Sequence, residues 1–238
     1  MKKHIIGPGK VGTALGNYLG VTPNKDIEKA KEADIIFITT PDQAIHEVYH
    51  LLKGSGKIFC HMSGLLTSDV FTEDIGFSVH PMAAVTKETN LQKVRFTIEG
   101  HAEKLHIIKS LFPNNKEIKK EAKPLYHASA VIASNFLVGI YNIAENLLKE
   151  VGFDEDTSIL IELIESTLNN IKEKGSINAL TGPVERMDIK TIKTHLNDLP
   201  IEYEKVYLSL SKYLVKIAEI KNKSNNYHQL LQLFHEQD

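Results

Sequence analysis

Hydrophobic and polar positions divide the chain into two parts with different periodicities. In the first part, short apolar runs alternate with segments of helical spacing, and after residue 121 only helical spacing remains. Strands that alternate with helices predict an α/β domain with a mostly parallel sheet. The expected strands span 3–6, 33–40, 57–61, 76–79 and 95–99.

The pattern of the second part predicts helices and no strands. Its apolar residues predict helices over 124–151, 156–174, 189–196 and 203–221, and a loosely docked helix in the polar tail 223–238. We therefore expect a nucleotide-binding α/β domain over 1–121 and an all-α domain over 122–238, with roles in substrate binding and dimerisation.

The first strand runs directly into a G-x-G-x-x-G motif, and a helical pattern follows it. Gly7 permits a tight turn, Gly9 lets the backbone approach a pyrophosphate, and Gly12 lets the helix pack close to the strand. The first N–H groups of such a helix point at the phosphates. The motif predicts a Rossmann domain whose cofactor-binding residues are Gly7, Pro8, Gly9, Lys10, Val11 and Gly12.

The second strand of a Rossmann domain is reduced in this sequence. Residues 20–26 are too polar for a buried strand, and 27–31 already has helical spacing. That strand normally ends in an acidic residue that holds the ribose, roughly 20 residues after the glycine motif. Asp26 is the nearest candidate, although turn or cap chemistry explains it better. Lys25 could pair with a 2′-phosphate or be solvated, so the choice between NAD and NADP stays open.

Polar residues follow several predicted strands at the end where doubly wound sheets bind ligands. Thr40, Pro41 and Ser63 are expected to line the cofactor site. His80 and His61 are each either a catalytic acid or a polar residue that closes the strand end.

Two further clusters lie in the helical part. His127 and Asn135 are eight residues apart on one predicted helix, which places them on one face and makes them candidate catalytic residues, with Ser134 as a substrate ligand. A buried asparagine needs a partner, either another helix or a substrate hydroxyl. The turn Thr181-Gly182-Pro183 precedes Arg186 and Asp188.

Arg186 has two interpretations. A guanidinium holds a carboxylate through two hydrogen bonds, so Thr181, Arg186 and Asp188 could bind an acidic substrate. Alternatively, Arg186 pairs with Asp188 and fastens the turn.

Net charge, apolar run length and cysteine content indicate which partners, compartment and cross-links to expect for this protein. The net charge of −2 indicates neither nucleic-acid nor membrane partners, and no uninterrupted apolar run reaches the roughly 20 residues of a membrane span. Gly7 and Pro8 interrupt any signal-peptide core, so we expect a cytoplasmic protein. The single cysteine, Cys60, excludes an intrachain disulfide and is expected to be buried; the scattered histidines form no metal motif.

The chain resembles Rossmann-like proteins with a C-terminal helical domain of unknown function. These are similar to the 6-phosphogluconate dehydrogenase-like superfamily, which includes ketopantoate, pyrroline-carboxylate and prephenate enzymes. The resemblance is carried by 7–16, Thr40-Pro41-Asp42, His61 to Gly64, Val79-His80-Pro81, His127, Ser134-Asn135-Phe136 and Leu180 to Asp188. The chain departs from the family pattern at Met187, where that pattern has glycine, and in its reduced second strand.

The resemblance implies NADP as the cofactor, a homodimer formed through the helical domain, and an oxidoreductase acting on a small 2-oxo or 2-hydroxy acid. In ketopantoate reductases a lysine and an asparagine on the first helix of the second domain polarise the carbonyl. His127 and Asn135 have similar spacing, which makes a histidine the candidate acid. Two alternatives remain: a non-catalytic nucleotide or metabolite sensor, and a prephenate-dehydrogenase-like enzyme in which His80 faces the nicotinamide.

Overall fold

The computed structural model describes residues 1–153, 156–223 and 225–236. It divides into two compact units, Met1–Leu137 and Val138–Asp238. We call them the sheet unit and the helical unit. The division falls after the domain boundary expected at 121/122, because the helix that begins at Lys123 still packs on the sheet.

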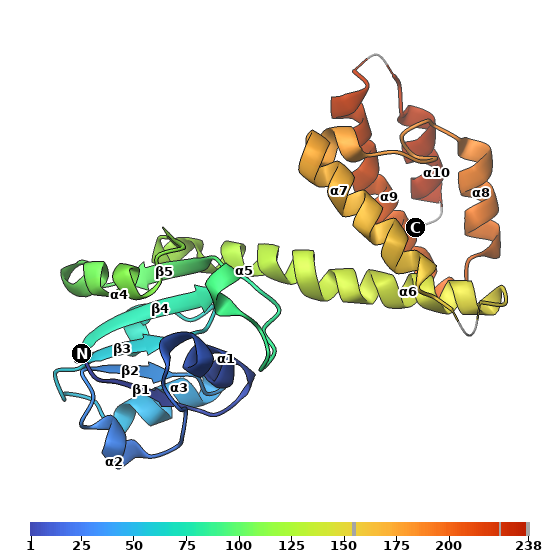
Figure 1. Cartoon of the computed structure of the whole chain (residues 1–238). Helices are drawn as coiled ribbons and strands as arrows, with labels where there is room; N and C mark the ends of the chain where they lie inside the picture. The colour runs from blue at the N-terminus through green and yellow to red at the C-terminus, as the bar shows by residue number, and fades with distance from the viewer. Residues whose placement is uncertain (154–155, 224, 237–238) are drawn as a thin grey trace. The chain divides into compact units, whose positions relative to one another are not determined.

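The sheet unit holds a six-stranded sheet whose strands follow one another in chain order (Figure 1). The first four strands are parallel, the fifth is antiparallel to the fourth, and the sixth is parallel to the fifth. Five of the strands match the prediction, whereas the sixth was missed because it has only three residues, all polar. Their bounds are β1 (Lys3–Ile6), β2 (Ile35–Ile38), β3 (Ile58–His61), β4 (Ile75–Pro81), β5 (Phe96–Gly100) and β6 (Asn115–Glu117).

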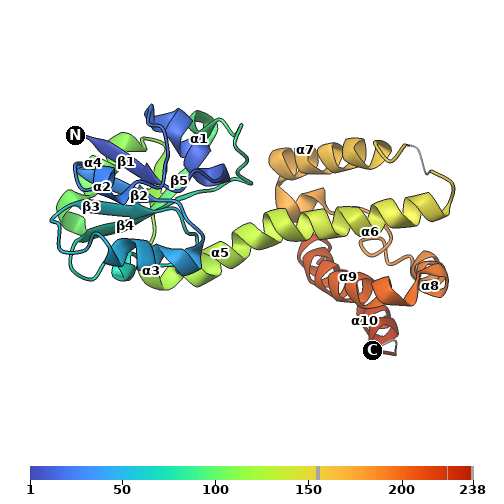
Figure 2. The ribbon, with the colours of Figure 1, turned by 90° about the horizontal axis from the view of Figure 1, so that it is seen from below.

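Helices cover both faces of this sheet (Figure 2). Side chains of α1 (Lys10–Leu19) and α4 (Leu105–Leu111) share one core with the sheet, and α2 (Ile27–Ala30) and α3 (Asp42–His50) share the other. All four residues of β2 are buried for this reason. Short 3₁₀ turns lie at Ser68–Val70, Leu91–Lys93, Ala102–Lys104 and Lys120–Ala122.

The second Rossmann strand is reduced to a single bridge. Asn24 pairs in parallel with Ile6. Its N–H donates to the Ile5 carbonyl at 3.0 Å, and its carbonyl accepts from the Gly7 N–H at 2.9 Å. The polar segment 20–26 therefore occupies the edge of β1 without forming a strand, as its composition predicts.

One continuous apolar helix leads out of the sheet unit. It comprises α5 (Lys123–Val131), a π-helical turn at Ile132–Phe136 and α6 (Leu137–Glu150). By length and composition, Lys120–Glu150 is the one helical stretch among the described residues that could span a membrane; an 18-residue window within it has a mean hydropathy of 1.3.

The helical unit has a core of its own. That core is built from Val184, Tyr227 and residues of α8 (Ile189–Asp198), α9 (Ile201–Lys221) and α10 (His228–Glu236). Leu230 and Phe234 of α10 are fully inside it, so the tail helix is not loosely docked as the sequence suggested. α7 (Ile159–Ala179) is interrupted at Gly175, whose φ of 75° is not helical, so the helix predicted to end at residue 174 does end there and a short further helical segment follows.

Candidate functional site

A cavity of about 380 Å³ opens at the carboxyl ends of β1, β2 and β3. This is the edge of a parallel sheet at which ligands bind. The lining residues come from the glycine loop and from the residues that follow β2 and β3. They are Gly9, Lys10, Val11, Thr39, Thr40, Pro41, Asp42, Met62 and Ser63.

The three motif glycines have different surroundings. A Cβ on Gly9 would meet nothing within 4 Å, so this glycine leaves open space on the cavity side. A Cβ on Gly12 would lie 1.8 Å from the Gly7 carbonyl oxygen, so Gly12 has the close-packing role expected of it. Gly7 itself has a φ of +113°, as the tight turn requires. Pro8 precedes Gly9 in the same loop, on an exposed surface.

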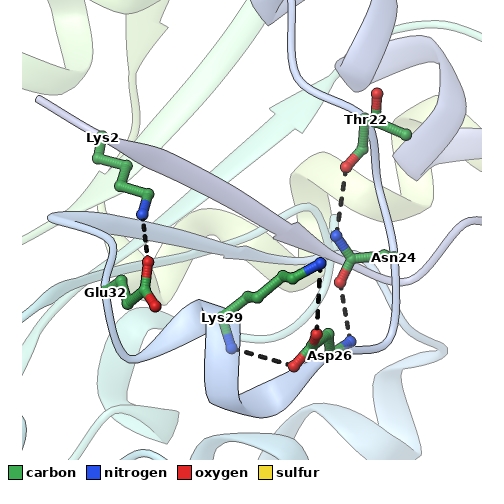
Figure 3. Close-up of polar contacts among 6 residues, drawn as sticks. All are labelled: Lys2, Thr22, Asn24, Asp26, Lys29 and Glu32. Carbon is green, nitrogen blue, oxygen red and sulfur yellow. Dashed lines mark hydrogen bonds and ion pairs between the residues drawn. The ribbon is translucent and has the colours of Figure 1, made fainter.

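The ribose end of the site lacks a free carboxylate on Asp26 (Figure 3). Its Oδ1 accepts from the Lys29 N–H at 3.0 Å and its Oδ2 lies 3.7 Å from Lys29 Nζ, so Asp26 caps α2. Its own N–H donates to Asn24 Oδ1 at 2.8 Å. Lys25 is exposed. The cap chemistry expected for Asp26 is confirmed.

Ser63 lines the cavity and also belongs to a polar cluster with Asp42, Ser78 and Lys123, called the Lys123 cluster below. Its Oγ donates to Asp42 Oδ2 at 2.6 Å and accepts from the N–H groups of Leu65 and Leu66. The Ser63 carbonyl accepts from Ser78 Oγ at 3.0 Å. Ser63 therefore fixes the loop after β3 while its side chain borders the cavity.

Lys123 is the positively charged residue of that cluster, and it is only 1% exposed. Its Nζ donates to Ser78 Oγ at 2.6 Å and to the Ser63 carbonyl at 3.2 Å. Burial lowers the pKa of this lysine to about 8, against the opposing charges of Glu99 and Asp42. An ammonium with such a pKa exchanges its proton near neutral pH.

The strand-end histidines are neutral at that pH. The pKa of both His61 and His80 is lowered to about 4, mainly by burial and also by the nearby charge of Lys123. His61 is fully buried, with Nε2 3.1 Å from the Thr67 carbonyl and Nδ1 accepting from the Ser63 N–H. His61 therefore closes the end of β3. Of the two roles expected for it, catalytic acid or polar residue at the strand end, this is the structural one.

His80 and His127 converge on Gly64. A Cβ on Gly64 would lie 2.4 Å from His127 Nδ1 and 3.0 Å from His80 Nε2, so only glycine fits between the two rings. The Nδ1 atom of His80 lies 2.7 Å from the Tyr126 hydroxyl. His127 Nδ1 is buried and has no hydrogen-bond partner among the described residues. A buried polar atom without a partner is rare in proteins and suits a ligand.

Ser134 and Asn135 lie in the π-helical turn. Ser134 Oγ donates to the Ala130 carbonyl at 2.7 Å and to Asn135 Oδ1 at 2.9 Å, and the Asn135 residue is exposed. A π turn changes the phase of a helix, so the spacing of His127 and Asn135 does not by itself put them on one face. Within the sheet unit the structure brings His127 to His80, and Asn135 to Ser134.

The Thr181–Asp188 segment forms a turn in the helical unit. Asp188 caps α8, accepting from the Thr191 N–H at 3.1 Å and from the Thr191 hydroxyl at 2.8 Å. Thr181 and Arg186 are exposed, and the Arg186 charge helps to lower the pKa of Asp188 after the contribution of Thr191. Met187 has a φ of 56°, which explains why the usual pattern has glycine at this position.

Two members of the site, Lys123 and Tyr126, were not predicted from the sequence, and they bond to Ser78 and His80. Asp42 belongs to the predicted Thr40-Pro41-Asp42 cluster and accepts from the Ser63 hydroxyl. A signal was present for the first two: Lys123, Tyr126 and His127 have i, i+3 and i+4 spacing on one helix, so they share a face.

Comparison with solved structures extends over nearly the whole chain. Protein TM1727 from Thermotoga maritima is 24% identical, with a TM-score of 0.78 over 92% of this chain and 99% of that one. The "putative NADP oxidoreductase BF3122" from Bacteroides fragilis is 21% identical, with a TM-score of 0.75 over 90% and 97%. Pyrroline carboxylate reductase from Plasmodium falciparum, solved with NADP bound, is 11% identical, with a TM-score of 0.62 over 93% and 98%.

These likenesses establish the fold: an N-terminal Rossmann-like domain followed by a helical domain, as the sequence predicts. No curated protein matches the chain. The family model described as "Domain of unknown function (DUF2520)" matches residues 94–214, which is more than half of the 238 residues. The chain therefore belongs to the DUF2520 family.

Proposed function

We propose that this protein is an NAD(P)H-dependent oxidoreductase that acts on a small 2-oxo or 2-hydroxy acid, similar to ketopantoate reductases. One observation carries the proposal: the cavity beside the glycine loop shares Ser63 and Asp42 with the cluster that buries Lys123. A nicotinamide cofactor in that cavity would supply or accept the hydride. The chain itself would supply the proton and hold the oxygen that receives it.

The cluster offers separate groups for these two tasks. Lys123 holds an exchangeable proton near neutral pH, and its positive charge stabilises an alkoxide that forms nearby. His127 Nδ1 is buried without a partner among the described residues, which supports assigning it the hydrogen bond to the substrate oxygen. His80 is the weaker acid candidate, because its low pKa keeps the ring neutral and the Tyr126 hydroxyl already occupies its Nδ1.

We infer a preference for NADP over NAD. A free carboxylate at the ribose favours NAD and repels a 2′-phosphate, and Asp26, the candidate for that role, caps α2 instead. Lys25 is an exposed cation next to it. The local charge therefore favours the phosphorylated ribose.

The substrate class rests on Arg186, with Thr181, Ser134, Asn135 and Asp188 as further candidates. An exposed guanidinium held by a capped turn suits a carboxylate. Within the described residues Asp188 already bonds to Thr191, which favours a supporting role for it. A sensor without turnover is the second candidate function, favoured by the reduced second strand.

We also propose a homodimer. Within the described helical unit no residue of α6 or α7 is buried. Leu163 and Val138 are 63% and 68% exposed, and an apolar groove of about 160 Å³ lies between α6 and α9. Apolar surface on this scale marks an interaction site, and a second copy of the chain would cover it.

Nucleotide titration tests the central proposal. We expect NADPH and NADP to raise the melting temperature, with weaker effects from NADH and NAD. Gly9→Val should abolish the shift with unchanged circular dichroism, because its side chain would occupy the open space on the cavity side. Gly139→Val, also with open space around its Cβ but on α6, is the control that keeps the shift.

The outcomes separate the candidate functions. Binding without turnover on any 2-oxo acid of a panel, ketopantoate included, would favour the sensor. An undiminished shift in Gly9→Val would place the nucleotide site elsewhere and overturn the oxidoreductase proposal.

A further inference from the structure

Two histidines face each other on the solvent side of α3. His46 Nε2 and His50 Nε2 lie 3.1 Å apart, with ring centroids 4.3 Å apart, and both residues are exposed. Neither belongs to the cofactor cavity or to the Lys123 cluster. This pair has no role in the oxidoreductase proposal.

The sequence of α3 fixes this arrangement. Ile45 and Tyr49 are buried one turn apart against the sheet, which anchors one face of the helix. His46 and His50 each follow one of these residues, so they are also one turn apart, on an adjacent, solvated face of the helix. The buried face thus holds the helix in the conformation that pairs the two imidazoles.

We propose that His46 and His50 form a binding site for a divalent transition-metal ion. A metal–imidazole bond is about 2.0–2.1 Å long, so two such bonds at about 90° place the nitrogens about 3.0 Å apart. The observed 3.1 Å between the Nε2 atoms matches that spacing. Among the described residues no group of three metal-ligating side chains occurs, so water completes the coordination.

Ligand chemistry selects the ion. Imidazole nitrogen suits Cu²⁺, Ni²⁺ and Zn²⁺ and is a poor ligand for Mg²⁺ or Ca²⁺, and the order of affinities is Cu²⁺ above Ni²⁺ and Zn²⁺. Because the two ligands are one helical turn apart, the metal binds only while α3 is folded, and it stabilises that helix. Asp42, which lines the cofactor cavity, is the first residue of α3.

Titration of the full-length protein with copper(II) tests the site. We expect one tight copper per chain by calorimetry, with two nitrogen ligands in the electron paramagnetic resonance spectrum. His46→Gln and His50→Gln should each weaken this binding by at least about tenfold, because a single imidazole remains. His106→Gln, which removes an exposed histidine of α4, is the matched control and should leave the binding unchanged.

A second measurement guards against misfolded variants. Nickel(II) should raise the melting temperature of the wild type by about 2–4 °C at saturating metal, and the shift should vanish in His50→Gln and at pH 5. Circular dichroism of the metal-free variants should match the wild type, since both side chains are exposed. Equal copper affinity in wild type, His46→Gln and His50→Gln would overturn the proposal. Neither result depends on nucleotide binding.

Discussion

The two units of this chain bury their side chains in opposite ways. In the sheet unit, both faces of the sheet are covered, and the buried charged groups Lys123 and Glu99 have hydrogen-bond partners, whereas the buried His127 Nδ1 has none among the described residues. In the described helical unit, the core draws on Val184 and α8 to α10, whereas α6 and α7 bury no residue. One unit is complete by itself, and the other leaves two helices with exposed apolar side chains.

This difference assigns separate tasks to the units. Buried polar groups stabilise little, but they hold chemistry in a fixed geometry, which fits a site for a cofactor and a reacting oxygen. Exposed apolar helices are a liability unless a partner covers them. We therefore expect substitutions in the sheet unit to alter stability or chemistry, and substitutions on α7 to alter assembly.

The largest effect is expected at Gly12. In Gly12→Ala, the new Cβ would lie 1.8 Å from the Gly7 carbonyl oxygen, and backbone cannot yield as a side chain can. We expect a loss of about 4 kcal/mol or more of unfolding free energy. Urea denaturation measures it, and Gly9→Ala, with no atom within 4 Å of its Cβ, should change stability by less than about 1 kcal/mol. Equal losses in both variants would contradict the packing role of Gly12.

Lys123→Met tests whether the buried cluster serves chemistry rather than folding. Methionine replaces the aliphatic stem and removes the buried charge, so the unfolding free energy at pH 7 should change by less than about 2 kcal/mol. Turnover should fall by about 10²–10⁴-fold, measured with NADPH and the best substrate of a 2-oxo acid panel. His127→Ala should lose a comparable factor and His80→Ala less.

The pH dependence of Lys123→Met supplies its control. The folded-state pKa of Lys123 lies at about 8, below the unfolded value of about 10.4, so between these values the unfolded chain binds the extra proton. Wild-type stability should therefore rise relative to Lys123→Met as pH increases above 8. Lys120→Met, on the surface beside Asp69, should affect neither turnover nor this slope. Wild-type turnover in Lys123→Met would rule out its proposed role.

The helical unit is tested by Leu163→Glu. This position on α7 is 63% exposed, and a symmetric dimer would contain the new charge twice. We expect the dissociation constant to rise by about 100-fold or more, because each 1.4 kcal/mol corresponds to about a factor of ten. Light scattering after gel filtration measures it, with Leu51→Glu on the sheet unit as the control for an equally exposed leucine. A wild-type chain that is monomeric at micromolar concentration would refute the homodimer.

The two units also differ in how much of their structure could be predicted from the sequence. Alternating apolar runs located β1 to β5, and the glycine spacing located the cavity, because both patterns are local. The buried cluster was harder, since Lys123 meets Ser63 and Ser78 across 60 and 45 residues of sequence. A lysine is normally solvated, so its sequence context gave no reason to bury it. In the helical part, the spacing found the helices but could not show which apolar faces the chain itself covers.

Acid should loosen the sheet unit first. The pKa values of His61 and His80 lie at about 4 in the folded state, against about 6.5 when unfolded, so the unfolded chain binds more protons between these values. Stability is fully present above about pH 6.5 and falls towards pH 4, by up to about 2.7 kcal/mol per pH unit for the two residues.

Amide hydrogen exchange, measured along the chain as a function of pH, reports the acid stability of each unit separately. Buried histidines occur in the sheet unit alone among the described residues. In the helical unit, hydrogen bonds from Asn222 and from Thr191 lower the pKa of Glu185 and of Asp188, so its acid loss begins below the ordinary carboxyl range. His80→Gln should remove about half of the slope. Simultaneous loss of protection in both units at pH 5 would contradict this order.

The smallest effects are expected at the turn before α8, where two neighbouring charges have different tasks. Asp188→Ala removes the cap that accepts from the Thr191 N–H and hydroxyl, and should lower the unfolding free energy by about 1 kcal/mol. Arg186→Ala removes an exposed side chain and should change it by less than about 0.5 kcal/mol. If Arg186 holds a substrate carboxylate, Arg186→Ala and Arg186→Lys should both raise KM, because lysine cannot form the paired hydrogen bonds. Nucleotide affinity should stay unchanged in both variants, since the glycine loop lies in the sheet unit. The competing role for Arg186 is to stabilise the turn. A wild-type KM in Arg186→Ala, together with a stability loss equal to that of Asp188→Ala, would establish that role and remove the reason for expecting an acidic substrate.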